Sequence, residues 1–156
     1  MEYSTNLKRG MGATSNSSSV NRKLAYGVFR LTLGINVLIH GAVRIFGPGT
    51  GAFAAKTGSE FADNPLPQGV VHVFLVVLPF AETILGLFIS VGLLTRWALT
   101  LGGLLMTALV FGTALRSDFS TLGVQMIYAI TYYLLLANLA DDYFSVDTLL
   151  RRHRNP

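Results

Sequence analysis

The chain has 156 residues, of which 51% are hydrophobic and only 13% are charged. An ordinary soluble domain carries roughly 25% charged residues, so this composition indicates a single-domain membrane protein. The chain contains no cysteine, which excludes disulfides, thiolate metal sites, iron–sulfur clusters and covalently attached c-type haem. The net charge of +4 does not indicate nucleic-acid binding, because the basic residues sit at the ends of apolar segments, as membrane topology requires.

The chain begins with a polar segment and continues with four apolar ones. Residues 1–23 contain the run GATSNSSS, and their composition predicts a mostly disordered N-terminal tail. Each apolar segment has about 19–25 residues, enough to cross a hydrocarbon core of roughly 30 Å as a helix. These segments are residues 24–46, 70–94, 96–115 and 122–140. We therefore expect an all-α fold, a transmembrane four-helix bundle over residues 24–140.

The connections between the segments differ in length. Residues 47–69 form a long loop, in which Ala52–Asp63 is expected to form a short helix at the membrane interface. The second and third spans are joined by a tight turn around Thr95 and Arg96. Residues 141–156 form a C-terminal tail, for which we expect a second interfacial helix with a basic end.

Basic residues are divided unevenly between the two ends of the spans. The side that carries the N-terminal segment has eight of them: Lys8, Arg9, Arg22, Lys23, Arg96, Arg151, Arg152 and Arg154. The other side has three: Arg44, Lys56 and Arg116. Because positive charge accumulates on the cytoplasmic side of a membrane, both termini are expected in the cytoplasm and the long loop outside.

The first span places three polar side chains at intervals of four residues. Asn36, His40 and Arg44 fall within about an 80° arc at 100° per helical residue. At ~1.5 Å per residue they run from mid-membrane to the outer end of the helix. Arg30 lies about 40° beyond this arc, nearer the inner end.

Two other spans also carry polar side chains. Glu82 lies roughly 18 Å into the second span, near mid-membrane. The outer half of the fourth span carries Gln125, Tyr128 and Tyr132. A polar face directed at lipid costs several kcal/mol, so we expect the three polar faces to converge inside the bundle. The third span, which has no ionisable residue between Trp97 and Leu115, is interpreted as packing material with small residues that permit close approach.

This set of side chains is compatible with several chemistries. His40 and His72 are poor candidates for the two axial ligands of a haem. Together with Glu82 they are equally poor candidates for a metal site, so neither haem nor metal is predicted. A buried ion pair of Glu82 with Arg30 or Arg44 would be purely structural. A quinone pocket fits better, because it needs donors for the carbonyl oxygens, an apolar groove and a titratable neighbour.

Two stretches of the sequence resemble the DoxX/DoxD family of small four-helix membrane proteins. They are RLTLGINVLIHGAVRIFG in the first span and PFAETILGLFISVGLLTRWA in the second. The positions that match the family pattern are Arg30, Gly34, His40, Gly41, Arg44, Gly47, Glu82, Gly86, Gly92, Thr95 and Arg96. The resemblance covers about residues 24–140 and implies the cytoplasmic (inner) membrane of a bacterium or archaeon. Some members are similar to the membrane subunit of thiosulfate:quinone oxidoreductase, and others resemble a partner in a membrane-associated oxidoreductase complex.

The leading hypothesis is therefore a membrane subunit of a quinone-linked oxidoreductase with other redox subunits as partners. In it Glu82 handles a proton and His40 donates to the quinone oxygen. The expected lining residues are Arg44, Asn36, Tyr128, Tyr132, Gln125 and Arg30. Two other roles stay open: a non-catalytic scaffold or assembly subunit of a larger membrane complex, and a small-solute or proton transporter. Whether the chain is itself an enzyme also stays open.

Overall fold

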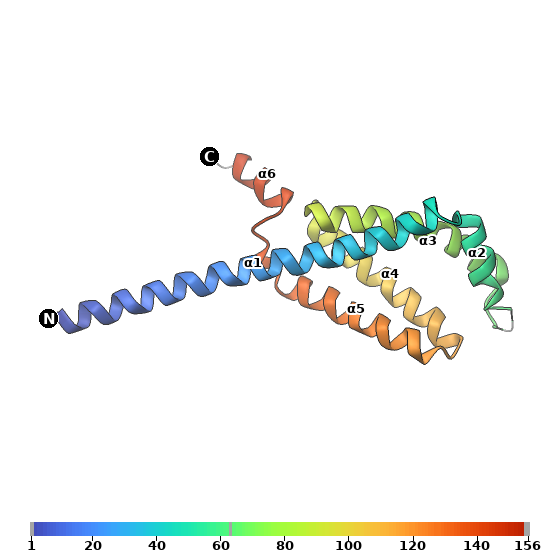
Figure 1. The fold of residues 1–156 in the computed structure, drawn as a ribbon, viewed down its shortest axis with the longest axis horizontal. Helices are drawn as coiled ribbons and strands as arrows, with labels where there is room; N and C mark the ends of the chain where they lie inside the picture. Colours follow the sequence, from blue (N-terminus) through green and yellow to red (C-terminus); the bar gives the residue numbers. More distant parts are fainter. Residues whose placement is uncertain (1, 63, 155–156) are drawn as a thin grey trace.

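The described part of the chain, residues 2–62 and 64–154 in a computed structural model, consists of helices joined by turns and contains no strand (Figure 1). Surroundings of side chains are described for residues 17–62 and 64–153. The elements are α1 (Glu2–Phe46), α2 (Thr50–Ser59), α3 (Gln68–Val91), α4 (Thr95–Leu115), α5 (Phe119–Ala137), the 3₁₀ turn η1 (Leu139–Asp141) and α6 (Val146–Arg154). The all-α fold expected from the sequence is confirmed.

Four helical stretches are long and apolar enough to cross a membrane. They are Ser17–Phe46, Gln68–Val91, Thr95–Leu115 and Phe119–Ala137. Large apolar side chains such as Val73, Leu104 and Ile127 are exposed on their outer faces, which is the surface that a bilayer would cover. The chain is thus a multi-pass membrane protein with the four spans predicted from hydropathy.

The N-terminal segment continues the first helix. α1 has no break at residue 24 and extends back to Glu2, and its first part projects away from the other helices (Figure 1). Helical backbone hydrogen bonds are local, so they can continue where no other helix packs. The disorder predicted for residues 1–23 stays a prediction, and the side chains of residues 2–16 lie outside the described ones.

The bundle is built from two closely packed helix pairs, α1 with α3 and α4 with α5. Glycines make the first contact possible: a Cβ on Gly34 would come within 2.5 Å of the Ser90 backbone nitrogen. A Cβ on Gly41 would overlap the Pro79 carbonyl, and one on Gly86 would overlap the Leu38 backbone. The small residues of α4 were expected to provide this close approach instead. That expectation was incomplete, because the tightest glycine contacts join α1 to α3.

On α4 a single glycine makes a comparably close contact. A Cβ on Gly102 would come within 2.6 Å of the Tyr132 ring on α5. An added Cβ at Gly103 or Gly112 would make only ordinary van der Waals contacts, at 3.8 Å and 3.6 Å. Gly102 therefore sets how deeply Tyr132, which is 3% exposed, enters the bundle.

The long loop contains α2, as its composition predicted, although the helix begins at Thr50 and ends at Ser59; Asp63 lies outside the described residues. α2 packs on α3. Its Ala54 and the following Phe61 join Val71, Leu75 and Leu78 in an apolar core at the end of the bundle where α3 begins. The loop is thus a helical cap on the bundle.

A buried arginine joins three segments at the end of the bundle where α3 ends and α4 begins. The Arg30 guanidinium donates hydrogen bonds to the carbonyls of Ile89 and Ser90 (3.0 Å to the latter) and to that of Phe144 at 2.7 Å. Asp142 lies 3.5 Å from Arg30 Nε. The last carbonyls of a helix have no partner within the helix, so Arg30 completes the C-terminal end of α3 and fastens the segment after α5 to it.

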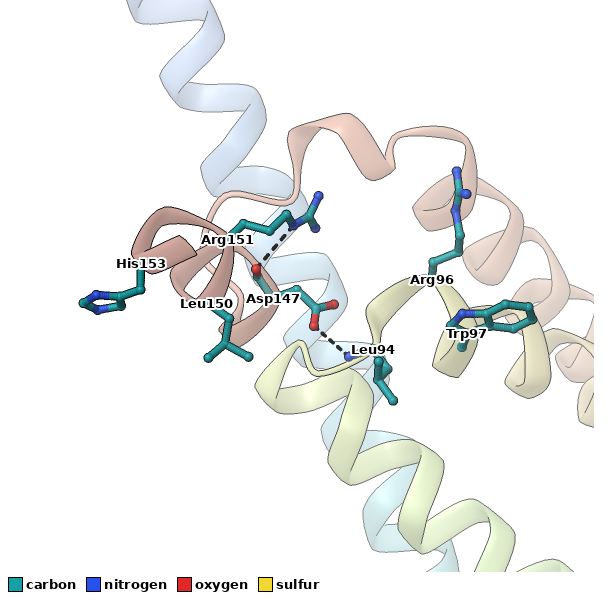
Figure 2. Close-up of a pocket in the computed structure, with 7 residues that line it drawn as sticks. All are labelled: Leu94, Arg96, Trp97, Asp147, Leu150, Arg151 and His153. Carbon is teal, nitrogen blue, oxygen red and sulfur yellow. Dashed lines mark hydrogen bonds between the residues drawn. The ribbon is translucent and has the colours of Figure 1, made fainter. Parts of the chain in front are cut away.

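The turn between α3 and α4 is completed by α6. Gly92 and Leu94 have φ values of 71° and 48°, so the chain reverses through the left-handed region. Asp147 on α6 accepts hydrogen bonds from the backbone N–H groups of Leu94 (2.9 Å) and Thr95 (2.8 Å), as Figure 2 shows for Leu94. Burial raises the pKa of the Asp147 carboxyl, but these backbone donors outweigh it and hold the pKa below its usual range. A charged carboxylate therefore caps the start of α4.

Candidate functional site

Polar side chains from three transmembrane helices line one cavity of about 170 Å³. They are Asn36, His40 and Arg44 on α1, Glu82 on α3, and Gln125, Tyr128 and Tyr132 on α5. α4 closes the cavity with Gly102, Leu105, Met106 and Leu109. We call this space the polar chamber. The structure thus brings together seven of the eight residues proposed from the sequence.

Arg30 is the exception. Its guanidinium binds the carbonyls at the end of α3, near Asp142, and it does not line the polar chamber. Helical phase placed Arg30 close to the polar face of α1, but nearly three turns of helix separate it from His40. The expectation that Arg30 lines the pocket was therefore wrong, and its position is that of a structural residue.

An ion pair crosses the chamber wall between α1 and α3. Arg44 donates a hydrogen bond to the Glu82 carboxylate. The Glu82 side chain is 9% exposed and that of Arg44 is 27% exposed. Arg44 also lies over the Phe53 ring, 4.7 Å from its centroid. Since a lone carboxylate at this depth is costly, Arg44 is the group that allows Glu82 to be charged there.

The chamber opens between α1 and α5. Tyr128 donates a 2.7 Å hydrogen bond to Asn36 Oδ1 across this gap, and Asn36 and His40 are exposed. α5 diverges from α1 toward the loop between α4 and α5 (Figure 1). In a bilayer this opening faces lipid, so a molecule dissolved in the membrane would reach His40 from the side.

Gln125 has hydrogen-bonding capacity that the described residues leave unused. Its Nε2 donates to Thr113 Oγ1 at 2.9 Å, which fixes the side chain against α4. Its Oε1 is buried and has no partner among the described residues. Buried polar atoms are normally paired, so this oxygen is a position where a ligand hydroxyl could bind.

A larger, mostly apolar chamber of about 450 Å³ adjoins the polar one. Arg44, Leu109, Thr121 and Gln125 line both. Most of the remaining wall consists of apolar side chains: Phe53, Phe61, Leu66, Val70, Val71, Phe74, Leu75, Leu78, Ala108 and Phe111. Thr57, Glu60, Gly112, Thr113 and Arg116 complete it. We call this space the apolar chamber.

The α2 segment closes the outer side of the apolar chamber. Arg116, at the end of α4, forms an ion pair with Glu60 and lies over the Phe61 ring, 5.1 Å from its centroid. Asn64 Nδ2 donates to the Leu115 carbonyl at 3.3 Å. Phe53 and Phe61 were not predicted as lining residues. The signal that could have found them is the spacing of Phe61 from Phe53 and Ala54, eight and seven residues, which places them on one side of a helix.

His72 lies apart from the other polar residues of the spans. It is exposed on α3 and lines neither chamber. Among residues 17–62 and 64–153, no three side chains of the histidine or carboxylate type lie together as a metal site. The described geometry therefore groups His40 with Glu82 and Arg44, and leaves His72 outside.

Four apolar spans around an internal polar chamber define a helical multi-pass membrane protein with a lipid-facing pocket. The family model for DoxX matches residues 27–116, more than half of the chain, and the chain therefore belongs to the DoxX family. No curated protein and no solved structure matches the chain. The matched range ends with α4, so Gln125, Tyr128 and Tyr132 belong to the part of the pocket beyond it.

Proposed function

We propose that this chain is the membrane subunit of a quinone-linked oxidoreductase complex and that the two joined chambers bind the quinone. The observation that carries the proposal is that a small space, to which His40, Glu82 and Gln125 contribute polar groups, shares a wall with a larger space lined mainly by apolar side chains. Together their volumes fall in the range of roughly 300–1,000 Å³ typical of small-molecule sites. A quinone has the same two parts, a ring with two carbonyl oxygens and an apolar tail.

The polar chamber offers groups for the ring and for proton transfer. A bound quinone supplies the capacity to accept two electrons and two protons. His40 donates a hydrogen bond to one ring oxygen, and Gln125 Oε1 accepts one from the hydroxyl of the reduced form. Glu82 supplies one of the two protons, and Arg44 stabilises the carboxylate that remains; the second proton comes from water. The electrons come from a partner redox subunit, because the chain has no cysteine-bound centre of its own.

The ion pair of Arg44 and Glu82 also supports a second role, that of a non-catalytic scaffold. It joins α1 to α3 at the site where the glycines already bring these helices together. In that role the pair stabilises helix register, and the chain provides only a membrane anchor for other subunits.

Binding of a short-chain quinone separates the two roles. The full chain in lipid nanodiscs is titrated with decylubiquinone, and bound quinone is measured after rapid separation. We expect saturable binding that weakens about tenfold in His40→Ala, the size of one lost hydrogen bond of about 1.4 kcal/mol. Glu82→Gln is expected to bind but to slow quinone reduction by the purified complex.

The matched control is His72→Ala, which removes a histidine at a site outside both chambers and is expected to bind as the parent does. Normal quinone reduction by a complex carrying both His40→Ala and Glu82→Gln would contradict the proposal. No binding by the parent chain, with partner subunits still co-purifying, would support the scaffold role instead.

We also propose that both termini lie in the cytoplasm, from the eight-to-three distribution of basic residues. The cysteine-free chain allows a direct test with single introduced thiols. In intact bacterial cells, a membrane-impermeant maleimide is expected to label Lys56→Cys on α2 and to leave Ser4→Cys unlabelled until the cells are opened. Labelling of Ser4→Cys in intact cells would reverse the orientation.

A further inference from the structure

A groove of about 600 Å³ lies at the opposite end of the molecule from the two chambers, where α6 meets the start of α4 (Figure 2). Its wall consists of Leu94, Arg96, Trp97, Asp147, Leu150, Arg151 and His153. The quinone proposal makes no use of this region. We call it the α4–α6 groove.

The groove has a fixed frame. Asp147 accepts from the backbone N–H groups of Leu94 and Thr95, and its own N–H donates to the Gly92 carbonyl at 3.0 Å. Arg151 Nε donates to the Asp147 carbonyl at 3.3 Å. Both oxygens of the Asp147 carboxylate are therefore engaged by the protein, and its negative charge is offset by the N-terminus of α4.

Two arginines, Arg96 and Arg151, line the groove together with Asp147, and a second carboxylate, Asp142, lines the hollow beside it. Figure 2 shows Arg151 of α6 on one flank of the Asp147 carboxylate and Arg96 of α4 on the other. The two arginines also line a second hollow of about 510 Å³, which shares Asp147 with the groove. Arg152 extends the basic region, lying over the Tyr143 ring at 4.2 Å from its centroid. Guanidinium groups on two separate elements suit a phosphate oxygen cluster, because each can offer paired N–H donors.

The remaining wall of the groove is apolar and exposed. Leu94 is 53% exposed, Trp97 is 64% exposed and Leu150 is 55% exposed. α4 begins at Thr95, so Trp97 lies at the end of a span, where tryptophans sit at the level of lipid headgroups. A molecule bound in this groove would contact guanidinium groups on the side that faces water and apolar side chains on the side that faces the membrane.

We propose that the α4–α6 groove binds the headgroup of an anionic phospholipid. Arg96 and Arg151 contact the phosphate, and the upper part of an acyl chain lies along Leu94 and Trp97. The apolar wall at the membrane boundary favours a lipid over a free phosphate, which would leave Leu94, Trp97 and Leu150 in contact with water. Bound lipid would also hold α6 against the start of α4.

Native mass spectrometry of the full chain in a neutral detergent tests the proposal. Dioleoyl phosphatidylglycerol is the probe, and dioleoyl phosphatidylcholine and inorganic phosphate are compared with it. We expect phosphatidylglycerol to bind more tightly than either. One basic residue near a lipid surface is worth about a fivefold change in affinity, so Arg96→Gln and Arg151→Gln together are expected to weaken binding about 25-fold.

Two controls distinguish the loss of positive charge in the groove from a general effect of the substitutions on folding. Arg96→Lys with Arg151→Lys preserves charge and is expected to retain most of the binding, while Lys56→Gln removes a charge at the far end of the molecule and is expected to change nothing. Equal binding of the two lipids, or unchanged phosphatidylglycerol binding in the double glutamine variant, would overturn the proposal. Phosphate binding as tight as that of the lipid would assign the groove to a soluble anion.

Discussion

Glu82→Ala is expected to destabilise the bundle more than any other single replacement in the polar chamber. It leaves the Arg44 guanidinium without its carboxylate partner between α1 and α3. Removing one member of a buried ion pair costs about 3–5 kcal/mol, and partly exposed Arg44 places this pair at the lower end of that range. The measurement is the apparent unfolding midpoint in detergent micelles, followed by circular dichroism.

The double replacement Arg44→Met with Glu82→Leu is the informative partner of this variant. Apolar side chains of similar volume often replace a buried ion pair without loss of stability, so we expect the midpoint to return toward that of the parent. The same double variant is expected to have lost quinone reduction. If Glu82→Ala unfolds at the parent's midpoint, the ion pair contributes nothing to the fold.

Gly86→Ala is expected to disrupt the contact between α1 and α3. The added Cβ would overlap the backbone of Leu38, and backbone atoms cannot move aside as a flexible side chain can. Inserting atoms into a well-packed interior costs about 1–3 kcal/mol or more, and here the cost includes separation of two helices. A lower unfolding midpoint and faster proteolysis in micelles are the expected results.

Gly103→Ala is the control for this helix-interior change. Alanine favours a helix over glycine by about 0.8–1.0 kcal/mol at either position, but the Cβ at residue 103 would meet nothing nearer than Tyr132 Cβ at 3.8 Å. Its stability is therefore expected to be unchanged or slightly higher. Equal effects of the two replacements would mean that α1 and α3 pack less tightly than the structure has them.

Hydropathy predicted the fold well, because each span must be long and apolar to cross a bilayer. It could not predict which helices pack most tightly. The glycines on α4 and those on α1 and α3 look alike in the sequence, and the difference depends on which faces meet. Nor could it predict that Asp147 reaches back to the turn between α3 and α4, a contact across 53 positions of the chain.

Site residues that lie on a single helix could be predicted from the sequence. Residues that several elements bring together were harder to predict. Spacing alone put Asn36, His40 and Arg44 on one face of α1, and the cost of polar groups in lipid directed that face inward. Arg30 was wrongly assigned to the pocket, because helical phase gives the direction of a side chain on α1 but not its binding partners. Its guanidinium binds carbonyls at the C-terminal end of α3. The apolar chamber was not predicted, because residues 50–66, which close it, are not apolar enough to stand out from a loop in a hydropathy profile.

The cap that Asp147 places on α4 also has a consequence for biosynthesis. The five helices α1 to α5 and the turn between α3 and α4 precede this residue in the chain, so they leave the ribosome first. Until residue 147 is made, the backbone N–H groups of Leu94 and Thr95 lack the carboxylate that they bind in the finished protein. The start of α4 is therefore completed only after all four membrane spans have been synthesised.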